Sequence, residues 1–308
     1  MSPHDPARAS IGRRRFLAAG AAAVAAAAAT GVWTWRIEPH WVETVRRRMP
    51  IMGLPPSLAG RTLLQVSDLH VGPVSSAYLI DTLREAALLR PDLVVVTGDF
   101  VTYRSPADLR ELARVLRALP QGRLGTFASL GNHDYGDAWS QLPVADALSG
   151  VVADAGARVL RNEAADVHGL QVAGLGDFWS PEFHDPGTTP LGTRGDGAAA
   201  RLLRTLDPAR PSVVLSHNPD AADADVWGGV HGWVLAGHTH GGQCKPPFLP
   251  PPILPVRNAR YSAGAFDVGG GRTLYVNRGL GHLLRVRFNA RPELTLFTLE
   301  PSPIPTPA

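Results

Sequence analysis

The sequence predicts a layered α/β fold, and two observations support this prediction. From about residue 61 onward, short apolar runs typical of buried strands alternate with segments of helical periodicity. Five of these runs end directly at polar residues rich in Asp, His and Asn, where ligands gather in open α/β sheets. The chain has 308 residues, 44% of them hydrophobic and 19% charged, which excludes a disordered chain, a collagen and a multi-span membrane protein.

The expected elements follow from the period of the apolar residues. Continuous apolar runs rich in Val and Leu predict buried strands, and apolar residues recurring every three or four positions predict amphipathic helices. In order along the chain, the prediction is strand 63–66, helix 76–89, strand 93–97, helix 107–119, and then strands 127–130, 213–216 and 233–236.

The polar residues at the strand ends have the spacing of metal ligands. Asp68 and His70 stand two positions apart, so that in an extended segment both side chains lie on one face, and His238 and His240 repeat this spacing. Each pair alone is a weak signal, because a single histidine is more often a structural residue than a ligand. The specificity lies in the ordered set D-x-H, G-D, G-N-H-D, a strand-terminal His, and G-H-x-H, which begin at Asp68, Gly98, Gly131, His217 and Gly237.

This ordered set resembles the calcineurin-like metallophosphoesterase superfamily over residues 63–299, and residues 237–243, 277–281 and 287–293 are similar to its YkuE/YaeI-type branch. The resemblance implies a four-layer α-β-β-α sandwich with a dinuclear metal site at the carboxyl ends of the strands. It also implies two sets of ligands. Asp68, His70, Asp99 and His240 would hold one metal ion, and Asp99, Asn132, His217 and His238 would hold the other.

The implied ligands suit a phosphoesterase. A carboxylate such as Asp99 can bridge two divalent ions, which lower the pKa of water so that hydroxide can attack phosphorus. His133 would then act on the leaving oxygen as a general acid or transition-state stabiliser, unless it is purely structural. Oxygen and nitrogen ligands without sulfur favour Mn, Fe or Zn, and the sequence does not choose among the three. With Cys244 as its single cysteine, the chain has neither an intrachain disulfide nor a thiolate-rich metal site.

The N-terminus has the layout of an export signal. Arg13, Arg14 and Arg15 precede an Ala-rich run that continues to Trp35, which resembles a twin-arginine signal and implies the twin-arginine export machinery as a partner. A basic flank on a buried helix is the alternative. The run spans roughly 30 Å as a helix, so whether it is cleaved or kept as an anchor stays open.

The positive charge of the chain is concentrated at the N-terminus. Residues 1–48 contain eight Arg and three acidic residues, so the remainder of the chain is about neutral and no nucleic-acid partner is expected.

The chain divides into four expected segments: a signal or anchor over 1–35, a connector over 36–60, the metallophosphoesterase domain over 61–300 and a disordered tail over 301–308. Residues 177–197 are rich in Gly, Pro and Asp and form either a loop over the site or a plain surface insertion. Arg46, Arg47 and Arg48 lie either close to a membrane or in a solvated turn.

Several further residues have alternative roles. Asp134 either orients His133 or belongs to a turn, and Arg278 contacts either substrate phosphate or solvent. Of the remaining histidines, His184 is a candidate for substrate contact. We expect Cys244 to be a small buried filler and assign no ligand role to His168, His231 and His282.

The favoured function is a metal-dependent phosphoesterase that acts outside the cytoplasm or at the membrane face, on phosphodiester or pyrophosphate bonds. The resemblance points to lipid-linked substrates, including pyrophosphates of the UDP-2,3-diacylglucosamine type. A protein Ser/Thr phosphatase is disfavoured, because Gly98-Asp99 continues with Phe100-Val101 rather than with the Asp-Arg pair of those relatives. The alternative is a non-catalytic module whose metal site grips phosphorylated lipid or cell-wall polymer.

Overall fold

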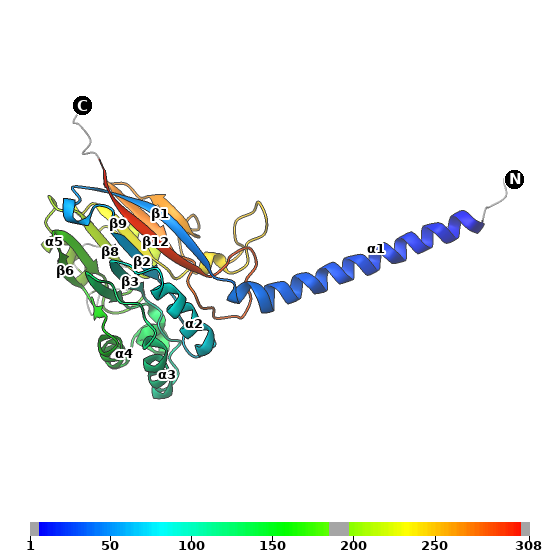
Figure 1. Ribbon diagram of the computed structural model, residues 1–308, viewed down its shortest axis with the longest axis horizontal. Coiled ribbons are helices and arrows are strands. Elements are labelled where there is room, and N and C mark those ends of the chain that lie inside the picture. Colours follow the sequence, from blue (N-terminus) through cyan, green and yellow to red (C-terminus); the bar gives the residue numbers. More distant parts are fainter. Residues whose placement is uncertain (1–5, 185–196, 303–308) are drawn as a thin grey trace, which may run out of the picture.

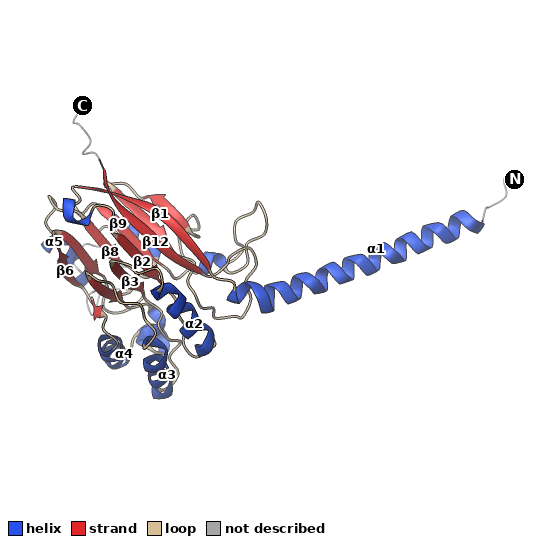
Figure 2. Cartoon of the chain, viewed as in Figure 1, coloured by secondary structure: helices blue, strands red, loops and turns tan. Residues whose placement is uncertain are grey.

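Two six-stranded sheets form the centre of the molecule, as a computed structural model describing residues 6–184 and 197–302 shows (Figures 1 and 2). One sheet has the order β1-β12-β2-β3-β4-β5 and the other the order β10-β11-β9-β8-β7-β6. The strands of the first sheet are β1 (Glu43–Met52), β2 (Thr62–Val66), β3 (Leu93–Thr97), β4 (Gly125–Ser129), β5 (Arg158–Val159) and β12 (Glu293–Ser302). Those of the second are β6 (Glu163–Val167), β7 (Leu170–Gly174), β8 (Ser212–Leu215), β9 (Gly232–Ala236), β10 (Gly264–Asp267) and β11 (Arg272–Val276).

Helices cover the outer faces of both sheets. Helices α2 (Ser76–Ala87), α3 (Pro106–Leu116) and α4 (Leu142–Asp154) pack on the first sheet, and α5 (Ala198–Thr205) packs on the second. A third apolar cluster, which includes Leu63, Val95, Leu215 and Leu235, fills the space between the two sheets. The expected four-layer α-β-β-α sandwich is therefore confirmed.

The helix starts follow from local sequence. At α3 the Ser105 hydroxyl accepts a hydrogen bond from the Ala107 N–H, and the Asp108 carboxylate accepts one from the Ser105 N–H. Pro106 occupies the first helical position, where its missing N–H costs no hydrogen bond. This cap fixes the start of α3 at the end of the loop that follows β3, and Asp99 lies in that loop.

Parallel pairing brings the carboxyl ends of the central strands together. Strands β2, β3 and β4 are parallel neighbours in the first sheet, and β8 and β9 are parallel neighbours in the second. All five were predicted from their apolar runs, and each is followed by one of the polar residue sets. Consequently the ends of both sheets meet at one edge of the sandwich.

The segment expected as a connector, residues 36–60, differs from the prediction because it contains strand β1. This edge strand pairs in parallel with β12 over ten positions, from Glu43 opposite Glu293 to Met52 opposite Ser302. Arg46, Arg47 and Arg48 are exposed residues of this strand and not of a turn, and Arg48 forms an ion pair with Glu300. The sequence did not reveal the strand, because only Met49 and Ile51 of β1 are fully buried and three charged residues stand in a row before them.

The N-terminal helix α1 (Pro6–Val32) extends away from the sandwich (Figure 1). It continues through a π-helical turn, Trp33–Ile37, and a short 3₁₀ helix, Glu38–His40. The segment Arg15–His40 is long and apolar enough to cross a membrane, and none of its most apolar window is buried in the protein. This exposure contradicts the alternative of a buried helix.

At the C-terminal end, β12 continues to Ser302, so the tail expected over 301–308 begins within a strand. Residues 303–308 lie outside the described part.

Candidate metal centre

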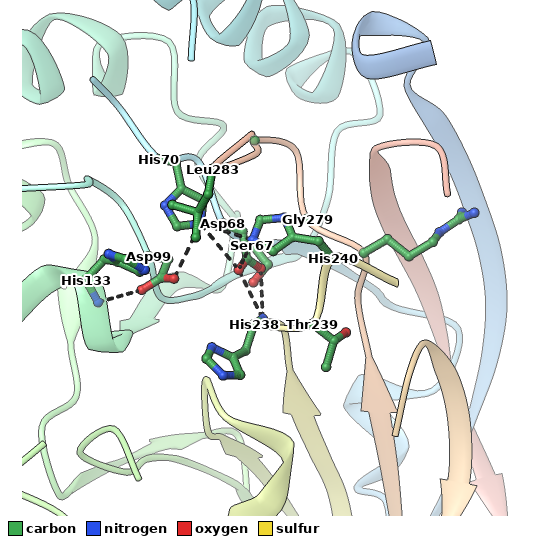
Figure 3. Close-up of polar contacts among 12 residues, drawn as sticks. Ser67, Asp68, His70, Asp99, His133, His238, Thr239, His240, Gly279 and Leu283 are labelled. Atoms are coloured by element: carbon green, nitrogen blue, oxygen red, sulfur yellow. Dashed lines mark hydrogen bonds and ion pairs between the residues drawn. The ribbon is translucent and has the colours of Figure 1, made fainter. Parts of the chain in front are cut away.

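Six polar side chains converge where the two sheets end. Asp68 and His70 follow β2, and Asp99 follows β3, all in the first sheet. The second sheet contributes His217 after β8, and His238 and His240 after β9, so both sheets supply side chains. Figure 3 shows His238 and His240 near Asp68. The seventh predicted residue, Asn132, begins the 3₁₀ helix Asn132–Tyr135 after β4. The structure therefore brings six of the seven predicted residues into two groups that could hold metal ions.

Asp68, His70 and His240 form the first group that could hold a metal ion, with one potential ligand atom from each within 4.8 Å of the others. His240 Nε2 lies 3.3 Å from Asp68 Oδ1 and 3.1 Å from His70 Nε2. Two ring nitrogens and a carboxylate oxygen therefore face a common point, which is the arrangement that a divalent ion requires.

Asp99, His217 and His238 form a second group of the same kind. His217 Nε2 lies 3.1 Å from Asp99 Oδ2 and 3.2 Å from His238 Nδ1. The same oxygen of Asp99 lies 3.4 Å from His70 Nε2 of the first group (Figure 3). Asp99 thus stands between the two groups, where a bridging carboxylate would have to be.

Each imidazole has one ring nitrogen directed at the centre and the other held by a partner outside it. His70 Nδ1 lies 3.0 Å from Thr102 Oγ1, and His217 Nδ1 lies 2.7 Å from the Thr97 carbonyl oxygen. The corresponding partner of His238 Nε2 is the Pro255 carbonyl oxygen at 2.8 Å. Outer partners of this kind fix the rotation of a ring and thereby the direction of its free nitrogen.

Asn132 could supply a neutral oxygen donor to the second group, because the next residue, His133, is hydrogen-bonded to Asp99 of that group. Its side chain is buried, and neither its amide oxygen nor its amide nitrogen has a hydrogen-bond partner among the described residues. A buried polar group without a partner costs roughly 1–3 kcal/mol, so such groups are rare unless a ligand or ion satisfies them. The unpaired amide and the donor set therefore fit the dinuclear site that the sequence predicted.

The backbone at the site is strained. Asp68, His70, Asp99, His238 and His240 have φ values of 53°, 48°, 53°, 71° and 51°, in the left-handed region that side chains disfavour. Close approach also demands glycine at Gly237, where a Cβ atom would lie 2.0 Å from Ser67 Oγ and 2.3 Å from Asp68 Oδ2. Strain of this kind, about 1–3 kcal/mol per residue, clusters at functional sites.

Burial keeps the imidazoles of the first group neutral. Desolvation lowers the pKa of His70 to about 3 and that of His240 well below its usual value. Desolvation likewise lowers the pKa of His238 to about 3. A neutral imidazole has the lone pair that a metal ion needs, so these rings are ready to bind at neutral pH.

The carboxylates concentrate negative charge in the same space. Burial raises the pKa of Asp68 to about 6, whereas for Asp99 burial is outweighed by His217 and His133, which lower its pKa. At His217, burial opposes the charged form, but Asp99 and Asp68 raise its pKa well above the usual value. The site therefore favours a cation, and the raised pKa of His217 is one result of this negative charge.

His133 lies beside the two groups rather than in either of them. Its backbone N–H donates a 3.0 Å hydrogen bond to Asp99 Oδ1, and its half-buried ring lies 5.2 Å from the His70 ring (Figure 3). Asp134 proves to be a turn residue, because its carboxylate accepts hydrogen bonds from the N–H groups of Gly131 and Val101. It does not orient the His133 ring.

Two further predictions on single residues, Arg278 and Cys244, need correction, and the one on His184 is not tested. Arg278 is neither a phosphate contact nor a free surface residue, because its guanidinium pairs with Glu43 and Glu293. His184 packs against Phe178, and its Nε2 donates a 3.1 Å hydrogen bond to the Phe178 carbonyl oxygen, so its contact with substrate stays a prediction. Cys244 is partly exposed rather than buried.

Two tryptophans and one arginine at the site escaped the sequence analysis. Trp179 meets the His238 ring edge-on at 4.5 Å and stacks on Trp139 at 4.9 Å. Trp179 belongs to the segment 177–197, so this part of the segment lies over the site, whereas residues 185–196 lie outside the described part. Arg287 is fully buried, and its Nη2 lies 3.3 Å from His240 Nδ1. The spacing of these residues does not predict their contacts with the site, because the residues that they contact are far away in sequence.

Comparisons with known proteins agree with this geometry. Residues 61–242 match the calcineurin-like phosphoesterase family. The chain is 31% identical over 301 residues to phosphodiesterase YaeI of Escherichia coli, covering 94% of this chain and 99% of the relative. It is 32% identical over 310 residues to the uncharacterized metallophosphoesterase YkuE of Bacillus subtilis, covering 94% and 98%. It is also 28% identical over 320 residues to the UDP-2,3-diacylglucosamine pyrophosphatase LpxG of Chlamydia trachomatis, covering 87% and 92%. The chain therefore belongs to the calcineurin-like phosphoesterase family and is a phosphoester hydrolase with a candidate two-metal site.

Proposed function

We propose that the chain is an exported phosphodiesterase or pyrophosphatase that acts on a lipid-linked substrate. The observation that supports the reaction best is the position of Asp99, whose Oδ2 lies within 3.4 Å of a ring nitrogen from each metal group. Asp68, His70, Asp99 and His240 would hold one ion, and Asp99, Asn132, His217 and His238 the other. Two bound divalent ions supply a nucleophilic oxygen near neutral pH and stabilise charge on the phosphoryl group.

The protein's own residues would orient the substrate and its leaving group. His133 stands next to Asp99 with a half-buried ring, so it can hold a proton at the leaving oxygen. Trp179, which stacks on Trp139, borders the second metal group at His238 and would offer a flat apolar surface to the organic part of a substrate.

The substrate class rests on the relatives. One is named a phosphodiesterase and another a pyrophosphatase for UDP-2,3-diacylglucosamine, a lipid-linked pyrophosphate. Export rests on the Arg13-Arg14-Arg15 motif, which lies in α1 just before its apolar part, with α1 as either a cleaved signal or an anchor. Replacing Arg13 and Arg14 by Lys should keep the protein in the cytoplasm, which fractionation would detect.

Hydrolysis of bis(p-nitrophenyl) phosphate tests the reaction. Purified full-length chain with Mn²⁺, Fe²⁺ or Zn²⁺ should hydrolyse it, and Asp99→Asn and His133→Ala should each lower kcat/KM by about 100-fold or more. Asp81→Asn makes the same change at an exposed carboxylate of α2 and should leave the rate unchanged. Wild-type protein that binds metal without hydrolysing any phosphoester would instead support the non-catalytic binding module.

A further inference from the structure

Exposed apolar side chains gather on two loops at one end of the sandwich. Phe248, Leu249 and Ile253 lie on the Pro-rich loop after His240, with exposed fractions of 105%, 60% and 78%. Leu283 and Leu284 lie on the loop before Arg287, with exposed fractions of 46% and 72%. We call these five residues the apolar rim. One exposed leucine is ordinary, but a cluster on neighbouring loops marks an interaction surface.

The two loops are joined to each other. The Lys245 N–H donates a 2.8 Å hydrogen bond to the Phe288 carbonyl, and the Phe288 N–H donates one of 2.8 Å to the Gln243 carbonyl. The Gln243 side-chain amide donates to the carbonyl oxygens of Leu284 and Val286. The apolar rim is therefore one surface on a fixed base rather than two independent loops.

The apolar rim borders the end of the candidate membrane span. The Arg287 N–H donates a 3.0 Å hydrogen bond to the Thr34 carbonyl, and the Arg285 guanidinium lies 5.9 Å from the Trp35 ring centroid. Phe248 shares a groove of about 570 Å³ with Trp33 and Trp41. In Figure 1, α1 leaves the sandwich on the side of these loops. A bilayer that receives α1 would therefore lie against the apolar rim.

The surroundings have the composition of a membrane interface. Trp33, Trp35 and Trp41 are partly exposed around the helix end, as in the aromatic belts of membrane proteins. Arg36 and Arg285 flank the Trp35 ring, and Arg291 lies 3.9 Å from the centroid of Trp41. Such cations favour the phosphate groups of lipids, while the exposed apolar side chains favour the acyl boundary.

The loop that carries Leu283 and Leu284 also begins and ends at the metal centre. The Gly281 N–H donates a 2.6 Å hydrogen bond to the Asp68 carbonyl, and the Leu280 N–H donates one of 3.0 Å to the Ser67 carbonyl. At the other end of the loop, Arg287 contacts the His240 ring. Figure 3 shows Leu283 in the same close-up as Asp68 and His70. Only a few residues therefore separate the apolar rim from the candidate metal ligands.

We propose that the apolar rim inserts into the surface of the bilayer beside α1 and holds the metal centre next to the lipid headgroups. The docking of the rim follows from its exposure and its position at the helix end. The delivery of a lipid substrate to the site rests in addition on the proposed function.

Lipid-dependent fluorescence quenching tests the docking without any need for activity. In full-length protein with Cys244→Ser, a single cysteine replaces Phe248, Leu284 or the control residue Leu88, which is 79% exposed at the end of α2. Each cysteine is labelled with bimane, and the protein is reconstituted into phosphatidylethanolamine and phosphatidylglycerol vesicles containing spin-labelled acyl chains. Quenching at positions 248 and 284 should exceed that at position 88 by about threefold or more. Equal quenching at all three positions would overturn the proposal. It would also be overturned if the bimane at positions 248 and 284 became buried only when another protein was added, because the apolar rim would then bind a protein partner.

A second experiment tests substrate delivery. The ratio of the rate on a lipid phosphodiester or pyrophosphate in vesicles to the rate on bis(p-nitrophenyl) phosphate should fall about tenfold in Leu283→Ser/Leu284→Ser. Leu88→Ser makes the same change on a remote surface and should leave the ratio unchanged. A ratio that stays constant in the double variant would overturn the link between the apolar rim and the lipid substrate. Wild-type protein without activity on either compound would contradict the proposed function, while the quenching result would still decide the docking.

Discussion

At the scale of single residues, the chemistry of the site depends on backbone conformations that few side chains tolerate. Asp68, Asp99 and His238 all have positive φ, and Asp, Asn and His are the side chains that adopt this region most readily. The residue types that suit a metal ion therefore also suit the sharp turns at the strand ends. This coincidence is why the ligand set could be predicted from the sequence as a short pattern after each strand.

The surroundings of the ligands could not be predicted in the same way. Arg287 reaches His240 from 47 positions away, and His238 meets Trp179 from a loop without periodicity. Contacts of this kind depend on how the sheets pack rather than on local spacing. For Asp134 the sequence allowed two roles, orienting His133 or forming a turn, and only its hydrogen bonds in the structure decide between them.

Asp134 should be important for stability. Asp134→Ala removes the acceptor for two buried N–H groups, Gly131 and Val101, at about 1–3 kcal/mol each. We therefore expect a loss of about 2–6 kcal/mol in the free energy of unfolding, measured by urea denaturation with tryptophan fluorescence. Asp134→Asn keeps one oxygen and should lose less. The exposed neighbour Asp137 supplies the control, and an Asp134→Ala midpoint equal to that of Asp137→Ala would contradict this role.

Metal affinity should fall in acid because of Asp68. Burial raises the pKa of its carboxyl to about 6, so below that pH a metal ion must displace a proton, whereas His70, with a pKa of about 3, stays neutral. Between about pH 6 and pH 4 the apparent Kd for Mn²⁺ should rise by about tenfold or more per pH unit, because a metal ion in the second group must also displace the proton of His217, and above about pH 7 the Asp68 term should level off. Isothermal titration calorimetry across this range measures the effect. A Kd that stays constant down to about pH 4 would show that Asp68 binds no proton in competition with the metal.

At the scale of elements, strands that consist of one continuous apolar run could be predicted from the sequence, whereas the partly exposed edge strand β1 could not. Residues Leu93–Thr97 of β3 are all buried, so their sequence has no polar interruption. In β1 the run of arginines occupies exposed edge positions and masks a strand in which only Met49 and Ile51 enter the core. An edge strand of this kind carries too few apolar residues to show a period.

Strand β1 should therefore be essential to the domain. A chain that begins at residue 36 retains β1, whereas one that begins at residue 61 loses the strand paired with β12 along ten positions. In the longer chain, Ile51→Ala should lower the free energy of unfolding by about 2–5 kcal/mol, because its side chain is only 1% exposed. Thr44→Ala, at an exposed position of the same strand, should have little effect. Equal unfolding midpoints for the chains starting at 36 and 61 would contradict the need for β1.

At the scale of the whole molecule, the candidate site lies across the junction of the two sheets. Asp68, His70 and Asp99 belong to one sheet, and His217, His238 and His240 to the other. The interior between the sheets is apolar, but this edge concentrates carboxylates and imidazoles whose charges are buried. Without ions, the buried charges at this edge oppose the packing of the two sheets. Bound ions would be held by ligands from both sheets and would therefore stabilise the packing.

Metal removal should therefore destabilise the whole fold rather than one loop. An ion present at 100 times its Kd stabilises the native state by about 2.7 kcal/mol, and a domain of this size gains about 2–4 °C in Tm per kcal/mol. Treatment with EDTA should lower the Tm by about 5–10 °C per saturated site, and adding back Mn²⁺, Fe²⁺ or Zn²⁺ should restore it, as differential scanning calorimetry would show. Because Asp99 contacts both groups, Asp99→Asn should respond weakly to EDTA, while Asp81→Asn should respond like the wild type. A wild-type Tm that does not change with EDTA would mean that no ion joins the two sheets, however well the side chains are arranged to receive one.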